Sequence, residues 1–314
     1  MKLTDPVFTD ADKARRYVER ERWPNGPVCP HCGNVDQDKI TGLKGKAHRA
    51  GVYQCAECRE QFTVTVGTVY ERSKIPLNKW LAAIFLMNAG KKGTSAHQIH
   101  RMLGVTYKTA WFMCHRIRES MREEGLEPLG GQGKIVEADE TYFGKSDAQR
   151  VSPQRKGRPY LKKGDKKRND RPVVSLVERG GRVRSFHVAV ADKANVQAIV
   201  AANVARESRL MTDESRLYHG ADQHFASHQT VKHSVGEYAR GDVNTNSAEG
   251  YFSVFKRGMK GVYQHCAEKH LHRYLAEFDF RFNHRAALGF TDGERAALAI
   301  RNASGKRLTY RPAN

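Results

Sequence analysis

The segment KIVEADETYFG, residues 134–144, contains a short apolar run that ends at Asp139. A second apolar run, in RLMTDES at residues 209–215, ends in the same way at Asp213. A third acidic residue, Glu249, lies early in the run SAEGYFSVFKRG, which has the pattern of an amphipathic helix. Two strand ends and a helix would support these three carboxylates rigidly, as a site that binds metal ions requires.

The segments between these runs complete the pattern of a sheet covered by helices. The runs RPVVSLVERG and GRVRSFHVAVA alternate in polarity, and Gly180-Gly181 between them predicts a hairpin. One helix is expected at about residues 195–206, and two more in SAEGYFSVFKRGM and KHLHRYLAEFDFRFNHR. The order strand, hairpin, helix, strand, helix predicts an α/β fold with a mixed sheet flanked by helices.

Four of the six cysteines form two CxxC pairs, Cys29/Cys32 and Cys55/Cys58, with 22 residues between the pairs. This spacing predicts a zinc ribbon, in which four thiolates bind one Zn²⁺ tetrahedrally; four unrelated buried thiols are the alternative. A closed shell of four sulfurs has no open position, so we expect the zinc to be structural. His31, inside the first pair, is then not needed as a ligand.

Residues 76–121 change to a helical period and divide at Gly104, with Thr106 as the expected N-cap of the longer second helix. This pattern predicts a helix-turn-helix, although a generic helical hairpin is an alternative because the motif has weak sequence specificity. The expected inward stripe is Ile99, Leu103, Ala110, Trp111, Cys114 and Ile117. The expected base contacts are Tyr107, Lys108 and Thr109. The basic residues expected on the outer face are Lys108, Arg116, Arg118 and Arg122.

The chain carries 54 Lys and Arg against 34 Asp and Glu, a formal net charge of +20. Such a charge favours a polyanionic partner such as nucleic acid, and an anionic membrane surface is the alternative. The sequence has no long apolar run and no secretory signal pattern, so a cytoplasmic protein is expected, located where the DNA lies.

The three carboxylates suit hard divalent cations, and two such ions can bind the attacking and leaving oxygens of a phosphodiester. The expected ions are two Mg²⁺, or Mn²⁺, held by Asp139, Asp213 and Glu249. On local grounds alone, the neighbouring carboxylates remain alternative ligands: Glu137, Glu140 and Glu214.

These segments resemble the DDE-type transposases of bacterial insertion sequences, in particular the Merlin-related group with an N-terminal zinc ribbon. The matching text is CPHC…CAEC, KIVEADETYFG, TDES, HSVGEYARGDVNTNSAEGYFSVFKRGMKGVYQH and KHLHRYLAEFDFRFNHR. The resemblance covers nearly the whole chain, assigns the triad to Asp139, Asp213 and Glu249, and implies a ribonuclease-H-like catalytic fold. It also implies that Lys256, seven residues after Glu249 and therefore on the same helix face, contacts DNA. We expect further DNA contacts at Arg257 and Lys260 in the same basic segment.

The implied activity is DNA strand cleavage followed by strand transfer, without a covalent protein intermediate. No cysteine nucleophile is needed, so Cys114 and Cys266 are expected to be core residues. The expected partners are the terminal inverted repeats of the element and target DNA, bound by a homodimer or larger assembly. The alternatives are a catalytically silent DNA-binding regulator derived from a transposase, and a nuclease of the same fold that does not join strands.

The expected domains are an N-terminal helix at 1–25, a zinc ribbon at 26–70, a helix-turn-helix at 71–124, a linker at 125–133, a catalytic domain at 134–290 with a basic insertion at 144–171, and a C-terminal tail at 291–314. The insertion would overhang the active site, where it could grip DNA or a second subunit, although such runs are usually only solvated. Histidines gather in the second half of the chain, at His224, His228, His233 and His265. A structural or surface role is the more common one for such residues, and a general acid or a phosphate contact is the alternative.

Overall fold

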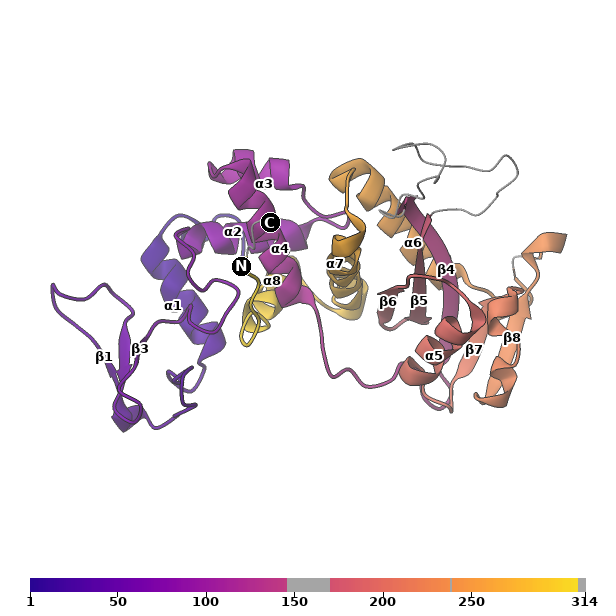
Figure 1. The fold of residues 1–314 in the computed structure, drawn as a ribbon, viewed down its shortest axis with the longest axis horizontal. Helices are drawn as coiled ribbons and strands as arrows, with labels where there is room; N and C mark the ends of the chain where they lie inside the picture. Colours follow the sequence, from indigo (N-terminus) through magenta and orange to yellow (C-terminus); the bar gives the residue numbers. More distant parts are fainter. Residues whose placement is uncertain (146–169, 238, 310–314) are drawn as a thin grey trace, which may run out of the picture. The chain divides into compact units, whose positions relative to one another are not determined.

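A computed structural model describes residues 1–145, 170–237 and 239–309 of the chain, and Figure 1 shows its ribbon. The chain divides into two compact units. Unit 1 consists of Met1–Glu124 together with His284–Asn314, and unit 2 consists of Gly125–Asn283. No helix among the described residues is both long and apolar enough to cross a membrane. The basic insertion expected at 144–171 lies almost entirely outside the described residues.

The first α-helix of unit 1 is α1 (Ala11–Arg22), whose N-terminus is capped by the Asp10 side chain. A three-stranded antiparallel sheet follows, formed by β1 (Ile40–Gly42), β2 (Tyr53–Cys55) and β3 (Gln61–Phe62). An aromatic cluster of Trp23, Tyr53 and Phe62 packs this small sheet, with ring centroids 5.6–5.8 Å apart.

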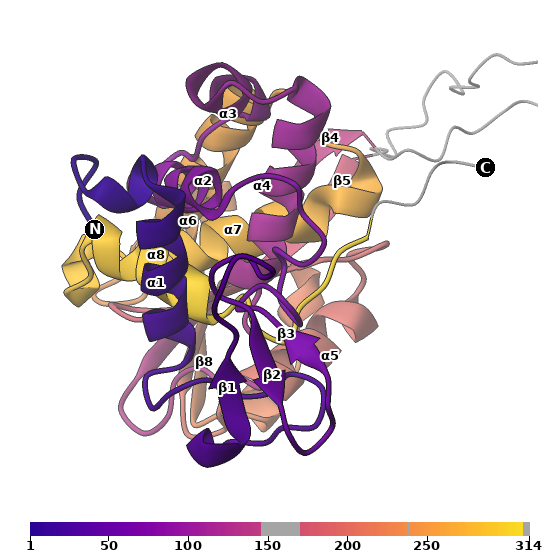
Figure 2. The ribbon, with the colours of Figure 1, turned by 90° about the vertical axis from the view of Figure 1, so that its left-hand side faces the viewer.

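The remainder of unit 1 is helical, with α2 at Leu77–Ala89, α3 at Ala96–Leu103, α4 at Tyr107–Met121 and α8 at Asp292–Arg301. Figure 2 shows α8 beside α1, and α8 also contacts α2 and α4. The prediction of a C-terminal tail at 291–314 is therefore wrong for residues 292–301, which form α8. Thr291 and Glu294 form a capping box at the start of α8, and this pair is a signal for the start of a helix that is visible in the sequence.

Unit 2 is built on a five-stranded mixed sheet with the order β6-β5-β4-β7-β8. The strands are β4 (Ile135–Lys145), β5 (Asp170–Glu178), β6 (Val183–His187), β7 (Arg209–Asp213) and β8 (Ser227–Val231). Strands β4, β7 and β8 are parallel, whereas β5 and β6 form the predicted hairpin and run antiparallel to β4. The edge strand β8 was not predicted, because its sequence SHQTV is polar and four of its five residues are only partly buried.

Helices cover both faces of this sheet, as the sequence predicted. Helix α5 (Lys193–Asn203) packs on one face against a core that includes Val136, Ala138 and Leu210. Helices α6 (Asn246–Gly258) and α7 (Leu271–Asn283) pack on the other face against a core that includes Val173 and Val177. Because successive strand residues point to opposite faces, Glu137 and Asp139 lie on the α6 face of β4, whereas Glu140 lies on the α5 face.

Candidate functional site

The pairing register of the central strands brings the two aspartates side by side. Parallel strands β4 and β7 pair Val136 with Leu210 and Glu137 with Met211. Continued by two residues along both strands, this register would set Asp139 beside Asp213, which agrees with the Coulombic effect by which Asp213 raises the pKa of Asp139. Since side chains alternate along a strand, both aspartates lie on the face that α6 covers. The sheet thus accounts for the first two acidic residues of the predicted triad.

The third acidic residue reaches this face because the first turn of α6 is hydrogen-bonded to Glu137 of strand β4. The fully buried Glu137 carboxylate accepts hydrogen bonds from the backbone N–H groups of Ser247 and Ala248, at 2.7 and 3.0 Å, and from the Ser247 hydroxyl at 3.0 Å. A carboxylate at this position satisfies unpaired N–H groups of the first helical turn and interacts favourably with the helix dipole. Glu249 directly follows this anchored turn, on the same sheet face as Asp139.

The three alternative ligands are each bound to protein groups. Glu137 holds α6 and also pairs with Arg179, whose Nε donates at 2.9 Å. Glu140 lies on the opposite sheet face, where it accepts hydrogen bonds from the Ser215 hydroxyl at 3.1 Å and from the Tyr218 hydroxyl at 2.7 Å. Glu214 accepts from both the backbone N–H and the hydroxyl of Ser234, at 2.8 and 2.9 Å. These contacts give each of the three carboxylates a structural role.

The candidate site brings several negative charges together. Burial, followed by the nearby carboxylates of Asp213, Glu140 and Glu249, raises the pKa of Asp139 from an ordinary 3.8 to about 7. Among the described residues, no Lys or Arg forms an ion pair with Asp139 or Asp213. The oxygen donors and their mutual repulsion fit a hard divalent cation, although among the described residues only the four ribbon cysteines form a close group of three or more possible metal ligands.

The basic residues predicted to contact DNA on α6 follow Glu249 along the same helix. Lys256 lies two turns later and is partly buried, and Arg257 is exposed, with its Nε donating to the Ser253 carbonyl at 3.1 Å. Lys260 is exposed in a π-helical turn, Met259–Tyr263, that extends α6. The structure thus places three cations on the helix that carries the third carboxylate.

The helical pair α3–α4 follows the predicted division, with Gly104 in the left-handed conformation (φ 59°) and Thr106 capping α4. Tyr107 is 44% exposed and stacks on His97 with ring centroids 4.2 Å apart. Lys108 is exposed, and the Thr109 hydroxyl bonds the Thr106 hydroxyl at 2.8 Å.

Two of the basic residues placed on the outer face of the second helix are not there. Arg118 is buried, with 2% of its surface exposed. Arg116 is partly buried and donates to the carbonyls of Val69, Glu71 and Leu308, at 3.0–3.1 Å. The helical period placed Arg116 on the outer face because it contains no information about the C-terminal segment, whose Leu308 carbonyl this side chain contacts.

The four ribbon cysteines converge as predicted, with all four sulfurs within 4.8 Å of one another. The Cys29 and Cys58 sulfurs lie 3.6 Å apart, and those of Cys32 and Cys55 lie 3.7 Å apart. A backbone hydrogen bond from Cys58 is the largest cause that lowers the pKa of Cys55, to about 6. Converging sulfurs and a stabilised thiolate fit one tetrahedral Zn²⁺, which the fold would use structurally.

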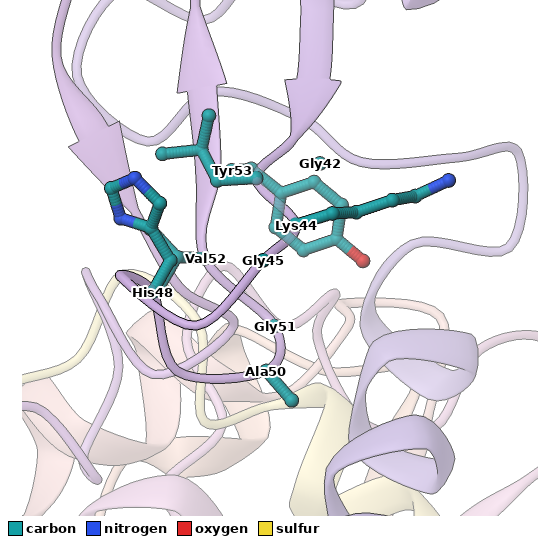
Figure 3. Close-up of a pocket in the computed structure, with 9 residues that line it drawn as sticks. Gly42, Lys44, Gly45, His48, Ala50, Gly51, Val52 and Tyr53 are labelled. Carbon is teal, nitrogen blue, oxygen red and sulfur yellow. The ribbon is translucent and has the colours of Figure 1, made fainter.

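A basic loop that the sequence analysis missed joins β1 to β2. This β1–β2 loop, residues 43–52, lines a cavity of about 420 Å³ together with Gly42 and Tyr53 (Figure 3). Its exposed charged or titratable residues are Lys44, Lys46, His48 and Arg49, and it contains no acidic residue. At its base, Gly51 has a φ of +81°, and a Cβ there would lie 2.4 Å from the Arg15 side chain of α1. The available signal was the run KGKAHR, basic and without an acid.

Comparison with known proteins agrees with this architecture. Residues 128–283 match the ISXO2-like transposase domain, and residues 9–61 match the transposase zinc-ribbon domain. The chain is also 27% identical over 280 residues to the "Uncharacterized protein in transposable element ISH50" of Halobacterium salinarum, and this match covers 88% of the chain and 92% of that protein. A zinc ribbon followed by a transposase domain defines a transposase of an insertion sequence. The chain belongs to the ISXO2-like transposase family, which confirms the resemblance stated above.

Proposed function

We propose that this transposase cleaves the DNA strand at the end of its element and joins that end to target DNA in a metal-dependent reaction. Unit 2 is the catalytic domain, of the ribonuclease-H-like class, and Asp139, Asp213 and Glu249 are its active-site carboxylates. The observation that carries this proposal is the register of β4 and β7, which pairs Glu137 with Met211 and, continued by two residues along both strands, would bring Asp139 next to Asp213. The docking of α6 on Glu137 then brings Glu249 to the same face.

The three carboxylates would hold two Mg²⁺ or Mn²⁺ ions, whose chemistry is to activate a nucleophile and to stabilise charge on the reacting phosphate. Asp139 would give up its proton when an ion binds, since its pKa of about 7 reflects burial beside like charges. Lys256 would contact a DNA phosphate on the face of α6 that carries Glu249. The reaction is hydrolysis at the element end, followed by attack of the freed 3′-hydroxyl on a target phosphodiester.

Unit 1 would recognise the inverted repeats at the element ends. Helix α4 would present Tyr107, Lys108 and Thr109 to base edges as the second helix of a helix-turn-helix. The zinc ribbon would bind the phosphate backbone of the DNA through the β1–β2 loop. The loop's cations Lys44, Lys46 and Arg49 form no ion pair among the described residues. Because two ends must be joined to one target, the working form would be a dimer or larger assembly on DNA.

The experiment compares three purified variants on labelled element ends and plasmid target in Mg²⁺. Asp139→Ala and Glu249→Ala should lose both cleavage and joining but should bind the ends like the unaltered protein. Glu207→Ala, which removes an exposed carboxylate of the same unit, is the matched control and should remain active. Joined products from both site variants would refute the assignment of the triad. An unaltered protein that only cleaves would be a nuclease, and one that only binds would be a regulator.

A further inference from the structure

His233 lies at the proposed active site, beside the third carboxylate. Its Nε2 is 3.8 Å from Oε1 of Glu249. His233 follows β8, whose last residue, Val231, pairs with Asp213 at the end of β7. The imidazole therefore approaches Glu249 from the segment that directly follows the strand beside Asp213.

The segment that carries His233 is fixed next to the second carboxylate. The backbone N–H and the hydroxyl of Ser234 both donate to Glu214, the residue after Asp213. On the other side of His233, the backbone N–H of Lys232 donates to Glu237 at 3.2 Å. These contacts hold the turn on both sides of the imidazole. The backbone of the turn is thus held beside the end of β7, and from there the imidazole points towards Glu249.

The separation of 3.8 Å between the two atoms distinguishes between types of contact. It exceeds the ~2.7–3.2 Å of a hydrogen bond from a ring nitrogen to an oxygen. Two ligands of one ion with bonds of about 2.1 Å lie about 3.0 Å apart at a right angle and about 4.2 Å apart on opposite sides of the ion. The observed separation falls within this interval. Both side chains also reach solvent, with 30% of His233 and 52% of Glu249 exposed, so an ion can enter between them.

We propose that His233 is a fourth metal ligand, which shares with Glu249 one of the two ions of the active site. This inference rests on the proposed function and adds a nitrogen donor to its oxygen donors. Oxygen ligands suit both Mg²⁺ and Mn²⁺, but the transition metal Mn²⁺ accepts an imidazole nitrogen more readily than the harder Mg²⁺ does. His233 therefore makes the site bind Mn²⁺ in preference to Mg²⁺, and the three carboxylates alone would show less of this preference.

The test measures metal binding directly, without DNA and without turnover. Zinc-loaded full-length protein is titrated with Mn²⁺, and the free ion is followed by its electron paramagnetic resonance signal; Mg²⁺ is then added to displace the bound Mn²⁺. In His233→Ala the Kd for Mn²⁺ should rise by about tenfold or more, the range found when groups that support a metal are removed. The Kd for Mg²⁺ should rise less, so the preference for Mn²⁺ should shrink.

Two further variants make the result decisive. His224→Ala removes an exposed histidine of the same unit and should bind both ions like the unaltered protein. Asp139→Asn should abolish tight binding of either ion. If Asp139→Asn binds Mn²⁺ normally, the proposed function itself fails. If Asp139→Asn loses binding while His233→Ala keeps an unchanged Mn²⁺ affinity or an unchanged preference, only the assignment of His233 is overturned. Circular dichroism of each variant excludes unfolding as the cause of a loss.

Discussion

Glu137 should be the acidic residue on which the position of the third carboxylate depends, although it is not a proposed ligand. Its carboxylate accepts two backbone N–H groups of the first turn of α6 and the Ser247 hydroxyl, and it pairs with Arg179. The substitution Glu137→Ala removes all of these acceptors and leaves the Arg179 guanidinium, which is 28% exposed, without its buried partner.

These contacts determine how much stability Glu137→Ala should lose. Breaking a buried ion pair from one side costs roughly 3–5 kcal/mol, and losing a helix N-cap costs about 1 kcal/mol. Because Arg179 keeps some access to water and also donates to the carbonyls of Asp242 and Asn244, we take the lower end, about 3 kcal/mol. In Glu137→Gln the shape is retained and the charge is lost, so the expected cost is smaller, about 1.5–3 kcal/mol.

Hydrogen exchange followed by mass spectrometry measures this loss where it occurs. At about 1.4 kcal/mol per factor of ten, the protection of amides in α6 and β4 should fall by about a hundredfold in Glu137→Ala. Amides of the zinc ribbon should be unaffected, since they belong to the other unit. Glu207→Ala, at an exposed position, should change protection by less than about threefold. Protection of α6 that stays within about threefold of the unaltered protein in Glu137→Ala would refute the anchoring role of Glu137.

Two further predictions concern charge. Burial and neighbouring carboxylates raise the pKa of Asp139 to about 7, above its ordinary 3.8, so the folded metal-free protein binds more protons than the unfolded chain between these values. The stability of the metal-free protein should therefore fall as pH rises from about 4 to about 7. Melting temperatures measured across this range should show the fall in the unaltered protein and not in Asp139→Asn. Equal slopes of melting temperature against pH in the two proteins would contradict the raised pKa. In the ribbon, replacing Lys44, Lys46 and Arg49 by Ser should reduce the salt dependence of binding to element ends by about 2.7 in log–log slope, at about 0.9 per phosphate contact. Replacing the paired cations Lys13, Arg16 and Lys39 by Ser is the control and should change this slope less. An unchanged slope in the loop variant would exclude phosphate contacts by the loop.

The zinc ribbon and the sheet could be predicted because their signals are local. Four sulfurs at CxxC spacing need only one tetrahedral ion to bring them together, and the structure gathers them within 4.8 Å. Similarly, alternation and the Gly180-Gly181 turn were sufficient for the hairpin of β5 and β6. In both cases the residues that determine the structure lie in the segment that adopts it.

The predictions that failed concern two arginines of α4, the strand β8 and the helix α8, and each failure has its own cause. Arg118 and Arg116 have the charge of outer-face residues, yet one is buried and the other donates to a carbonyl 192 residues away. Strand β8 was missed because an edge strand buries little, so its sequence lacks the apolar alternation by which strands are recognised. The helix α8 was missed in a segment that we treated as a tail, although its capping box is visible in the sequence.

The run EADE shows why the site itself needed the structure. Three of its four residues are acidic, and any of the three could be a metal ligand by composition. Strand alternation separates Glu140 from the other two, and its hydroxyl partner Ser215 comes from 75 residues away. Glu137 and Asp139 share a face, and they differ only in what reaches them. Glu137 accepts hydrogen bonds from the backbone N–H groups of Ser247 and Ala248, which are 110 and 111 residues away. Asp139 instead has further carboxylates as neighbours. A carboxylate that meets donors stabilises the fold, whereas one that meets other carboxylates either binds a proton or favours a nearby cation. The neighbours supplied by the fold therefore distinguish Glu137 from the proposed ligand Asp139.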